Sequence, residues 1–188
     1  MSWQQFYDSI ENCAKCALSQ ERNHIVPGEG NAHADILFVG EGPGYEEDMQ
    51  GRPFVGRAGQ LLDKMIAAIG LQREDVYIAN IVKCRPPGNR TPSDEEAAAC
   101  LPYLREQFKL IRPKIIVCLG ATPARHIIDP SVRITRDRGV WTQRKDIYIM
   151  PTFHPAALLR DQSKKKDAWE DFQAVRDKLK ELKETQIV

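Results

Sequence analysis

Short apolar runs rich in β-branched residues alternate along the chain with longer amphipathic segments. Four such runs contain few polar positions and are bounded by turn residues: 34–40, 75–83, 113–120 and 146–153. Runs of this kind are typical of strands that are buried on both faces of a sheet. The pattern therefore predicts four strands separated by helical segments.

The segments between these runs carry apolar residues at helical spacing. Helices are expected over four ranges: 58–71, 93–111, 121–129 and 165–184. Ser93 and Glu96 have the spacing of a capping box, which starts the second helix at Ser93. Strand–helix–strand repetition predicts an α/β fold, a four-stranded parallel sheet flanked by helices. The last residues, 185–188, are expected to be frayed.

Length and charge narrow the class of protein. A chain of 188 residues suits a single domain, 1–188. The net charge is only +1, which argues against a dedicated nucleic-acid coating protein, although basic residues gather in 83–90, 133–138 and 158–166. The sequence contains no signal-peptide pattern and no apolar run long enough to cross a membrane, so we expect a cytoplasmic protein.

Ligands of parallel α/β sheets bind at the carboxyl ends of the strands. The first such end here is the turn "GEGPG", residues 40–44, and acidic residues follow it. This turn has neither the G-x-G-x-x-G spacing of a dinucleotide-binding loop nor the Lys of a P-loop. A nucleotide-binding α/β enzyme is therefore a disfavoured alternative.

Three side chains near the strand ends suit a flat polar ligand. Phe54 is either a core aromatic or a stacking platform. Asn80 lies among apolar residues, so its amide is either satisfied within the protein or offers a donor and an acceptor to the edge of a nucleobase. His154 precedes Pro155, which favours an extended backbone at the same rim; alone it fits a core or surface histidine as well.

Two leucines and a cation follow that histidine, at Leu158, Leu159 and Arg160. Such a group fits a wedge that enters a base step and is anchored on a phosphate. It equally fits an ordinary buried turn of helix. The first interpretation predicts DNA contact at these three residues.

Five cysteines raise the question of a metal, because disulfides are rare in the cytosol. Cys13 and Cys16 form a C-x2-C pair, and Cys84 and Cys100 are able to supply two further thiolates. Four thiolates suit zinc or an iron–sulfur cluster, and unrelated reduced cysteines are the alternative. Cys118 lies inside an apolar strand and is excluded as a ligand.

Three motifs, taken with these cysteines, resemble a known family. "GEGPGYEEDMQGRPFVGRAGQLLD", "NIVKCRPPGNRTP" and "HPAALLR" look like the iron–sulfur-containing family 4 uracil-DNA glycosylases of bacteria and archaea. The likeness extends from Cys13 to about Arg160. It implies a uracil-DNA glycosylase-like fold and a mainly structural [4Fe–4S] cluster, held by Cys13, Cys16, Cys84 and Cys100.

The resemblance also implies a uracil pocket. The backbone of Glu41 and Gly42 and the side chains of Phe54, Asn80 and His154 would hold the base. Phe54 would stack on the ring, Asn80 would pair with its O4 and N3 edge, and His154 would donate to O2.

The implied activity is hydrolysis of the N-glycosidic bond of a uracil flipped out of double- or single-stranded DNA. A monofunctional enzyme, acting as a monomer, would leave an abasic site and so begin base excision repair. Better-known uracil-DNA glycosylases place a water-activating Asp where this chain has Gly42, so Glu41 is the candidate for positioning water. Glu47 would exclude the methyl group of thymine. A non-catalytic iron–sulfur or zinc DNA-binding protein is the alternative.

Overall fold

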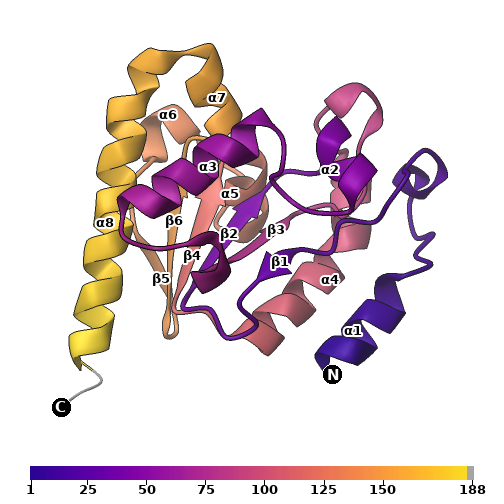
Figure 1. The fold of residues 1–188 in the computed structure, drawn as a ribbon, viewed down its shortest axis with the longest axis horizontal. Coiled ribbons are helices and arrows are strands. Elements are labelled where there is room, and N and C mark those ends of the chain that lie inside the picture. Colours follow the sequence, from indigo (N-terminus) through magenta and orange to yellow (C-terminus); the bar gives the residue numbers. More distant parts are fainter. Residues whose placement is uncertain (186–188) are drawn as a thin grey trace.

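The computed structural model describes residues 1–185. Its sheet has six strands in the order β1-β3-β2-β4-β6-β5, with helices on both faces (Figure 1). The strands are β1 Glu29–Gly30, β2 Ile36–Gly40, β3 Tyr77–Asn80, β4 Ile115–Leu119, β5 Thr142–Arg144 and β6 Ile147–Thr152. The expected frayed end lies outside the described residues except for Thr185, which still belongs to the last helix.

The four predicted strands form the parallel centre of the sheet, β3-β2-β4-β6. The predicted strand total is wrong, because β1 and β5 add short antiparallel edges to β3 and β6. These edge strands have only two and three residues, too few to produce a readable alternation of apolar and polar positions. The sheet is therefore mixed, with a parallel core.

Eight α-helices and four 3-10 turns of the described chain connect and cover the strands. The helices are α1 Trp3–Ile10, α2 Tyr45–Gln50, α3 Arg57–Ala68, α4 Asp94–Ile111, α5 Ala121–Ile127, α6 Ile134–Asp137, α7 Pro155–Arg160 and α8 Lys165–Thr185. The 3-10 turns are η1 Ala17–Gln20, η2 Arg73–Asp75, η3 Pro87–Asn89 and η4 Gln162–Lys164. The predicted capping box is confirmed at α4, where Ser93 Oγ accepts from Glu96 N at 3.1 Å.

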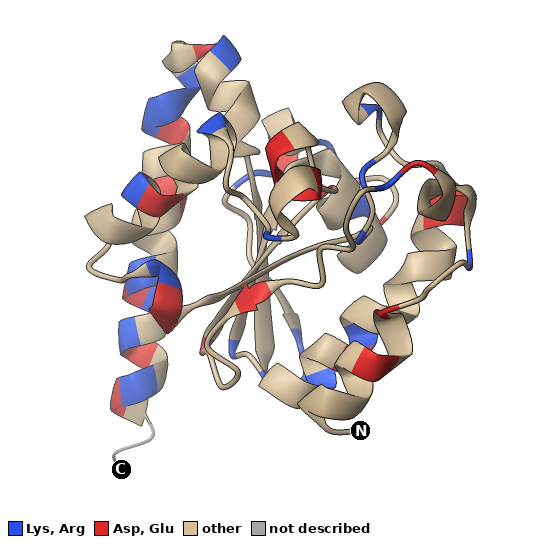
Figure 2. Ribbon diagram, turned by 45° about the vertical axis from the view of Figure 1, so that its right-hand side comes forward, with Lys and Arg blue, Asp and Glu red and all other residues tan. Residues whose placement is uncertain are grey.

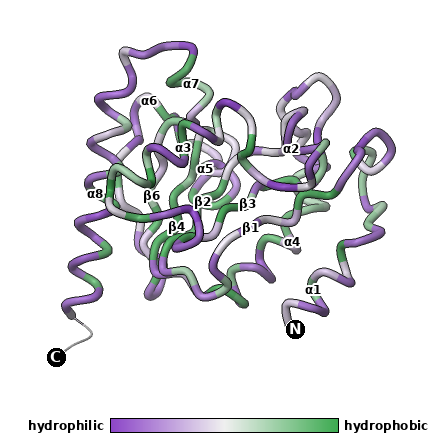
Figure 3. The backbone as a smooth tube through the Cα atoms, in the orientation of Figure 1, coloured by the Kyte–Doolittle hydropathy of each residue, from purple (hydrophilic) through white to green (hydrophobic). Residues whose placement is uncertain are grey.

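Each face of the sheet has its own apolar cluster. On one face, Leu37 of β2 belongs to the same cluster as Phe6 of α1 and Leu104 of α4. On the other face, Phe38 stacks on Phe172 of α8, with a ring-centroid distance of 5.6 Å. In Figure 3 the central strands are largely hydrophobic, whereas outer segments such as α8 are largely hydrophilic. Burial on both faces explains why the central strands read as continuous apolar runs.

The parallel register brings the carboxyl ends of the central strands to one edge. Gly40 pairs with Asn80, and Leu119 pairs with Thr152, so the turns that follow these strands meet at this edge of the sheet. Figure 2 shows several Lys and Arg positions, drawn as blue ribbon, near this edge where α7 runs into α8. None of the described helices is long and apolar enough to cross a membrane.

Candidate active site

A cavity of about 680 Å³ opens at this edge, between the turns that follow β2, β3, β4 and β6. Six residues for which the sequence predicts a role in holding or converting a base line this cavity: Glu41, Gly42, Glu47, Phe54, Asn80 and His154. They come from segments far apart in the chain. The cavity is large enough for an extruded nucleotide, since ligand pockets usually measure roughly 300–1,000 Å³.

Asn80 ends β3 with its side chain almost fully buried, at 1% exposure. Its Oδ1 atom accepts no hydrogen bond from any of the described residues. A Cβ atom at Gly40 would lie only 2.5 Å from this oxygen, so the glycine lets the amide sit against the strand. Leaving a buried acceptor unpaired costs about 1–3 kcal/mol, and such an atom marks a place where a ligand donor fits.

His154 lies directly before α7 and caps it. Its Nδ1 atom accepts from Ala156 N at 3.0 Å, so the proton of the neutral ring is assigned to Nε2. Burial, and secondly the nearby charge of Arg160, lowers the pKa of His154 to about 4, against an opposing effect of Glu47. At neutral pH the ring is therefore an uncharged hydrogen-bond donor.

Phe54 forms one wall of the cavity. Its ring stacks on that of His154, with a centroid distance of 5.4 Å and an interplanar angle of 29°. A Cβ atom at Gly40 would lie 2.6 Å from Phe54 Cζ, so a glycine there is needed for both Phe54 and Asn80. The sequence contains this glycine in "GEGPG", but its role depends on residues that only the fold brings together.

The two acidic candidates have different hydrogen-bond partners. Glu41 Oε2 accepts from the hydroxyl of Thr122 at 2.5 Å. Glu47 Oε1 accepts from the backbone N–H groups of Val55, at 3.0 Å, and Gly56, at 2.9 Å. Gly56 is the N-cap of α3, so Glu47 holds the turn that carries Phe54 into that helix. Glu41, in contrast, is restrained by the side chain of Thr122.

The predicted DNA wedge is only partly exposed. Leu158 is 1% exposed and packs with Phe153 and Ala168, so DNA contact at Leu158 stays a prediction that its burial disfavours. The cause is that 155–160 is a helix whose inner face joins the core. Leu159 is 37% exposed and Arg160 lines the cavity, so these two residues remain available to DNA.

Two lysines near the cavity were not anticipated. Lys83 is completely buried and donates to the backbone oxygen of Asn80 at 2.9 Å and to Gln107 Oε1 at 2.6 Å. Lys164 lines the cavity, with its ammonium 3.8 Å from Asp161 Oδ2. The only sign in the sequence that Lys83 is buried is its position after apolar residues in "NIVKC". Nothing in the sequence distinguishes Lys164 from its basic neighbours.

The four predicted cysteine ligands line a second, narrow cavity near α1 and α4: Cys13, Cys16, Cys84 and Cys100. Cys118 is fully buried in β4 and does not line it. Burial raises the pKa of Cys100 to about 11. Two donors face the sulfurs, the N–H of Lys83 at 3.3 Å from Cys100 Sγ and Arg22 at 3.4 Å from Cys84 Sγ.

These cysteines are not gathered around a single point. Within residues 1–185, no group of three or more His, Cys, Asp or Glu side chains is placed to hold one metal ion. A [4Fe–4S] cluster takes each of its four thiolates on a different iron, and hydrogen bonds to the sulfurs tune such sites. The shared cavity and the two donors therefore fit a cluster better than a single zinc ion.

The mixed sheet with a parallel centre and a cavity at the carboxyl ends of its central strands places the chain in the α/β class, whose ligands bind at that edge. The family model of the Uracil DNA glycosylase superfamily matches residues 27–173. The chain therefore belongs to the uracil-DNA glycosylase superfamily and, by the similarity of the relatives below, to its type-4 family.

Curated relatives are similar over most of the chain. A type-4 uracil-DNA glycosylase of Thermotoga maritima is 51% identical over 160 residues, which cover 83% of this chain and 82% of the relative. That of Sulfurisphaera tokodaii is 46% identical over 185 residues, 94% of this chain and 84% of the relative. A type-5 uracil-DNA glycosylase of Pyrobaculum aerophilum is more distant, at 29% identity. The family predicted from the three sequence motifs is thus confirmed.

Proposed function

We propose that this chain acts as a single-domain, monomeric and monofunctional uracil-DNA glycosylase. It would hydrolyse the N-glycosidic bond of a flipped deoxyuridine and leave an abasic site for base excision repair. The unpaired Oδ1 of Asn80 is the observation that carries the proposal, because it is a buried acceptor at the wall of a base-sized cavity.

Uracil matches this acceptor and cytosine does not. Uracil N3 carries a hydrogen that Asn80 Oδ1 would accept, and the amide nitrogen of Asn80 would donate to O4. Cytosine presents an unprotonated N3 and an amine at C4, so both contacts would be mismatched in a buried site. Mismatches of this kind are costly because polar groups are left without partners. Phe54 would stack on the face of the base held in this way.

His154 supports the departure of the base. Breaking the N-glycosidic bond leaves negative charge on uracil, and donors already in place stabilise that charge most in the transition state. The neutral ring fits this role, because Nδ1 is occupied by Ala156 N–H and the proton resides on Nε2. That proton would be donated to O2 of the leaving uracil.

The partners of the two acids favour different roles for them. Thr122 holds one oxygen of Glu41, and Glu41 lines the cavity, so its other oxygen would orient the attacking water. Both amides that face Glu47 hold its Oε1. A carboxylate fixed in this way suits steric exclusion of the thymine methyl group. The backbone of Glu41 and Gly42 would contact the base.

DNA contact is assigned to the basic rim. Leu159 would enter the space left by the flipped base, with Arg160 on a neighbouring phosphate. Both double- and single-stranded substrates would be accepted, because every catalytic contact is made to the extruded nucleotide.

Lys164 lines the same cavity, so a covalent imine with the sugar has to be tested. Borohydride should trap no complex with a monofunctional enzyme.

The cofactor proposed for Cys13, Cys16, Cys84 and Cys100 is a [4Fe–4S] cluster. When bound, it would cross-link the N-terminal segment to the loop after β3, and no step of base excision depends on it. Broad visible absorbance with bound iron and sulfide is the expected result for purified protein. Stoichiometric zinc without that absorbance would contradict the assignment.

Incubation with a labelled oligonucleotide that carries one deoxyuridine, followed by alkali, tests the function. Strand breaks at the uracil are expected opposite G, opposite A and in single strands, and only after alkali. Matched oligonucleotides with cytosine or thymine at that position serve as controls. Binding without release of uracil in any of these contexts would favour the non-catalytic DNA-binding protein instead.

A further inference from the structure

Phe54 has an unusual backbone conformation for an aromatic residue. Its φ is +50°, in the left-handed region that glycine normally occupies. A side chain in this region persists only when its surroundings hold it there, and such residues concentrate at functional sites. The ring that lines the cavity is therefore directed by whatever fixes this turn.

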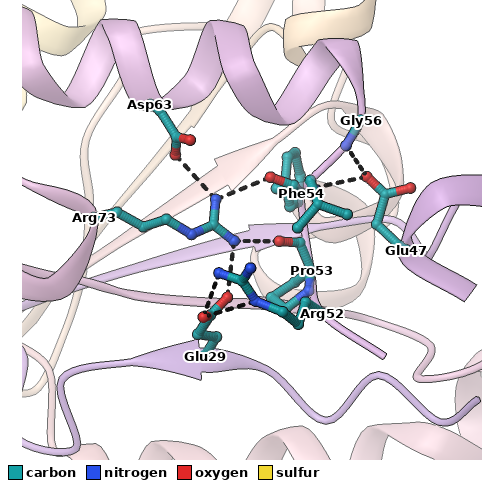
Figure 4. A network of polar contacts seen from close by, with 9 residues as sticks. Glu29, Glu47, Arg52, Pro53, Phe54, Gly56, Asp63 and Arg73 are labelled. Atoms are coloured by element: carbon teal, nitrogen blue, oxygen red, sulfur yellow. Dashed lines mark hydrogen bonds and ion pairs between the residues drawn. The ribbon is translucent and has the colours of Figure 1, made fainter. Parts of the chain in front are cut away.

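Arg73 of η2 holds the carbonyl side of the turn (Figure 4). One guanidinium nitrogen donates to Phe54 O at 2.9 Å, and the other donates to Pro53 O. The same group is fixed by Asp63 of α3, at 2.9 Å, and by Glu29 of β1, at 3.1 Å. The guanidinium group is planar and its N–H donors point in fixed directions, so it is able to hold several acceptors at once.

Glu47 holds the amide side of the same turn through Val55 N–H and Gly56 N–H. Helix α3 closes the third side, because a Cβ atom at Gly59 would lie 1.8 Å from Phe54 O. The turn is thus fixed by a cation on its carbonyls, a carboxylate on its amides and a glycine beneath it. Arg73 is not among the described residues that line the cavity, so it acts on the ligand only through this turn.

We propose that Arg73 is a positioning residue for the base-stacking wall of the pocket. It keeps Phe54 in the left-handed conformation in which the ring stacks beside His154 and faces the base. This proposal rests on the uracil-DNA glycosylase function proposed above. Loss of Arg73 would free the carbonyls of 53–54 and let Phe54 relax out of the wall, without removing any atom that contacts uracil.

A double-mutant cycle on kcat/KM for single-stranded deoxyuridine oligonucleotide tests the proposal. Arg73→Met should lower kcat/KM by about 10- to 100-fold, the scale expected for misplacement of a binding group. In a Phe54→Ala background the same change should cost less than about threefold, since the wall is already lost. Arg73→Lys keeps the charge with fewer contacts and should give an intermediate loss.

The matched control is Arg52→Gln. Arg52 pairs with the same Glu29 carboxylate but is half exposed and makes no contact with the 53–54 carbonyls. Its kcat/KM should stay within about twofold of wild type. Inhibition by free uracil is a second readout, which Arg73→Met should weaken and Arg52→Gln should not.

Two results would overturn the proposal. One is wild-type kcat/KM in Arg73→Met, and the other is an equal loss from Arg73→Met with and without Phe54, which would indicate a merely structural residue. If Arg73→Met does not fold, Arg73→Lys takes its place in the cycle. An inactive wild-type protein would refute the proposed function itself and is therefore distinguishable from failure of this inference.

Discussion

The base pocket and the cysteine cavity lie on either side of the segment 80–84, and they are built differently. The pocket is wide, and two of its polar groups are already in place for a ligand. Asn80 Oδ1 accepts no hydrogen bond from the described residues, and His154 is fixed by Ala156 N–H. The cysteine cavity is narrow, and its thiols are not arranged around a common point. The polar groups of the pocket are therefore placed by contacts within the protein, whereas the four thiols only share a cavity.

Lys83 joins the two regions. Its backbone N–H faces Cys100 Sγ, and its side chain holds the backbone oxygen of Asn80. Asn80 and Cys84 lie four residues apart on either side of this contact. Because Lys83 contacts both regions, a bound cluster would stabilise the segment that carries Asn80. The geometry of the pocket itself depends on hydrogen bonds within the protein.

Removing a pocket donor should have the largest effect. Asn80→Ala and His154→Ala should each raise the barrier of the chemical step by roughly 2–4 kcal/mol, because each removes a preorganised contact to the developing anion. Single-turnover kinetics on a deoxyuridine oligonucleotide measure this. Weaker binding with an unchanged chemical rate would assign these residues to recognition alone.

Disrupting the cysteine region should affect stability more than chemistry. Cys84→Ala should abolish the visible absorbance and lower the thermal midpoint by roughly 5–10 °C, equivalent to a few kcal/mol. Excision per folded molecule should fall less than in Asn80→Ala. Cys118→Ala is the control, since that thiol lies in β4 away from the cavity and its loss should leave the absorbance intact. An unchanged spectrum in Cys84→Ala would contradict the ligand assignment.

Acid should weaken the pocket side through His154. Its folded pKa of about 4 lies below the ordinary value of 6.5, so the unfolded chain binds the extra proton between these values. The stabilising contribution is complete above pH 6.5 and is lost as pH falls towards 4, at up to ~1.4 kcal/mol per pH unit.

The difference in unfolding free energy between wild type and His154→Ala, measured from pH 7 to 4, isolates this contribution. It should shrink as pH falls. Parallel curves for wild type and His154→Ala would mean that folding does not lower the pKa of His154.

Thr122→Val should have a moderate effect on the chemical step. It removes the hydroxyl that restrains Glu41, and a hydrogen bond to a charged group is typically worth about 1.5–3 kcal/mol. We expect kcat to fall about tenfold with KM nearly unchanged, and Thr122→Ser to restore most of the rate. A large rise in KM alone would indicate that Thr122 contacts the substrate instead.

The smallest expected effect is at the wedge. Leu159→Ala should slow excision from duplex DNA about two- to fivefold and leave single-stranded DNA nearly unaffected, because only the duplex has a base stack to open. Single-turnover rates on the two substrates provide the measurement. An equal loss on both would mean that Leu159 does not act in base flipping.

The sequence predicted the central strands because they form continuous apolar runs, and the longer helices because their apolar residues recur at helical spacing. It left α7 open between a loop wedge and a buried turn of helix, although Pro155 stands at the first helical position, where proline is common. The site residues were predicted from motifs at the strand ends. Thr122 and Arg73 were not, because their partners Glu41 and Phe54 are 81 and 19 residues away and no local pattern records such contacts.

Single-turnover excision from paired oligonucleotides, identical except for one deoxyuridine or deoxycytidine, tests the central claim most directly. Wild type should release uracil and no cytosine, and Asn80→Ala should lose roughly 100-fold or more of the uracil rate. Selective excision that depends on Asn80 is the predicted result. Release of both bases at similar rates, or a wild-type uracil rate in Asn80→Ala, would contradict it.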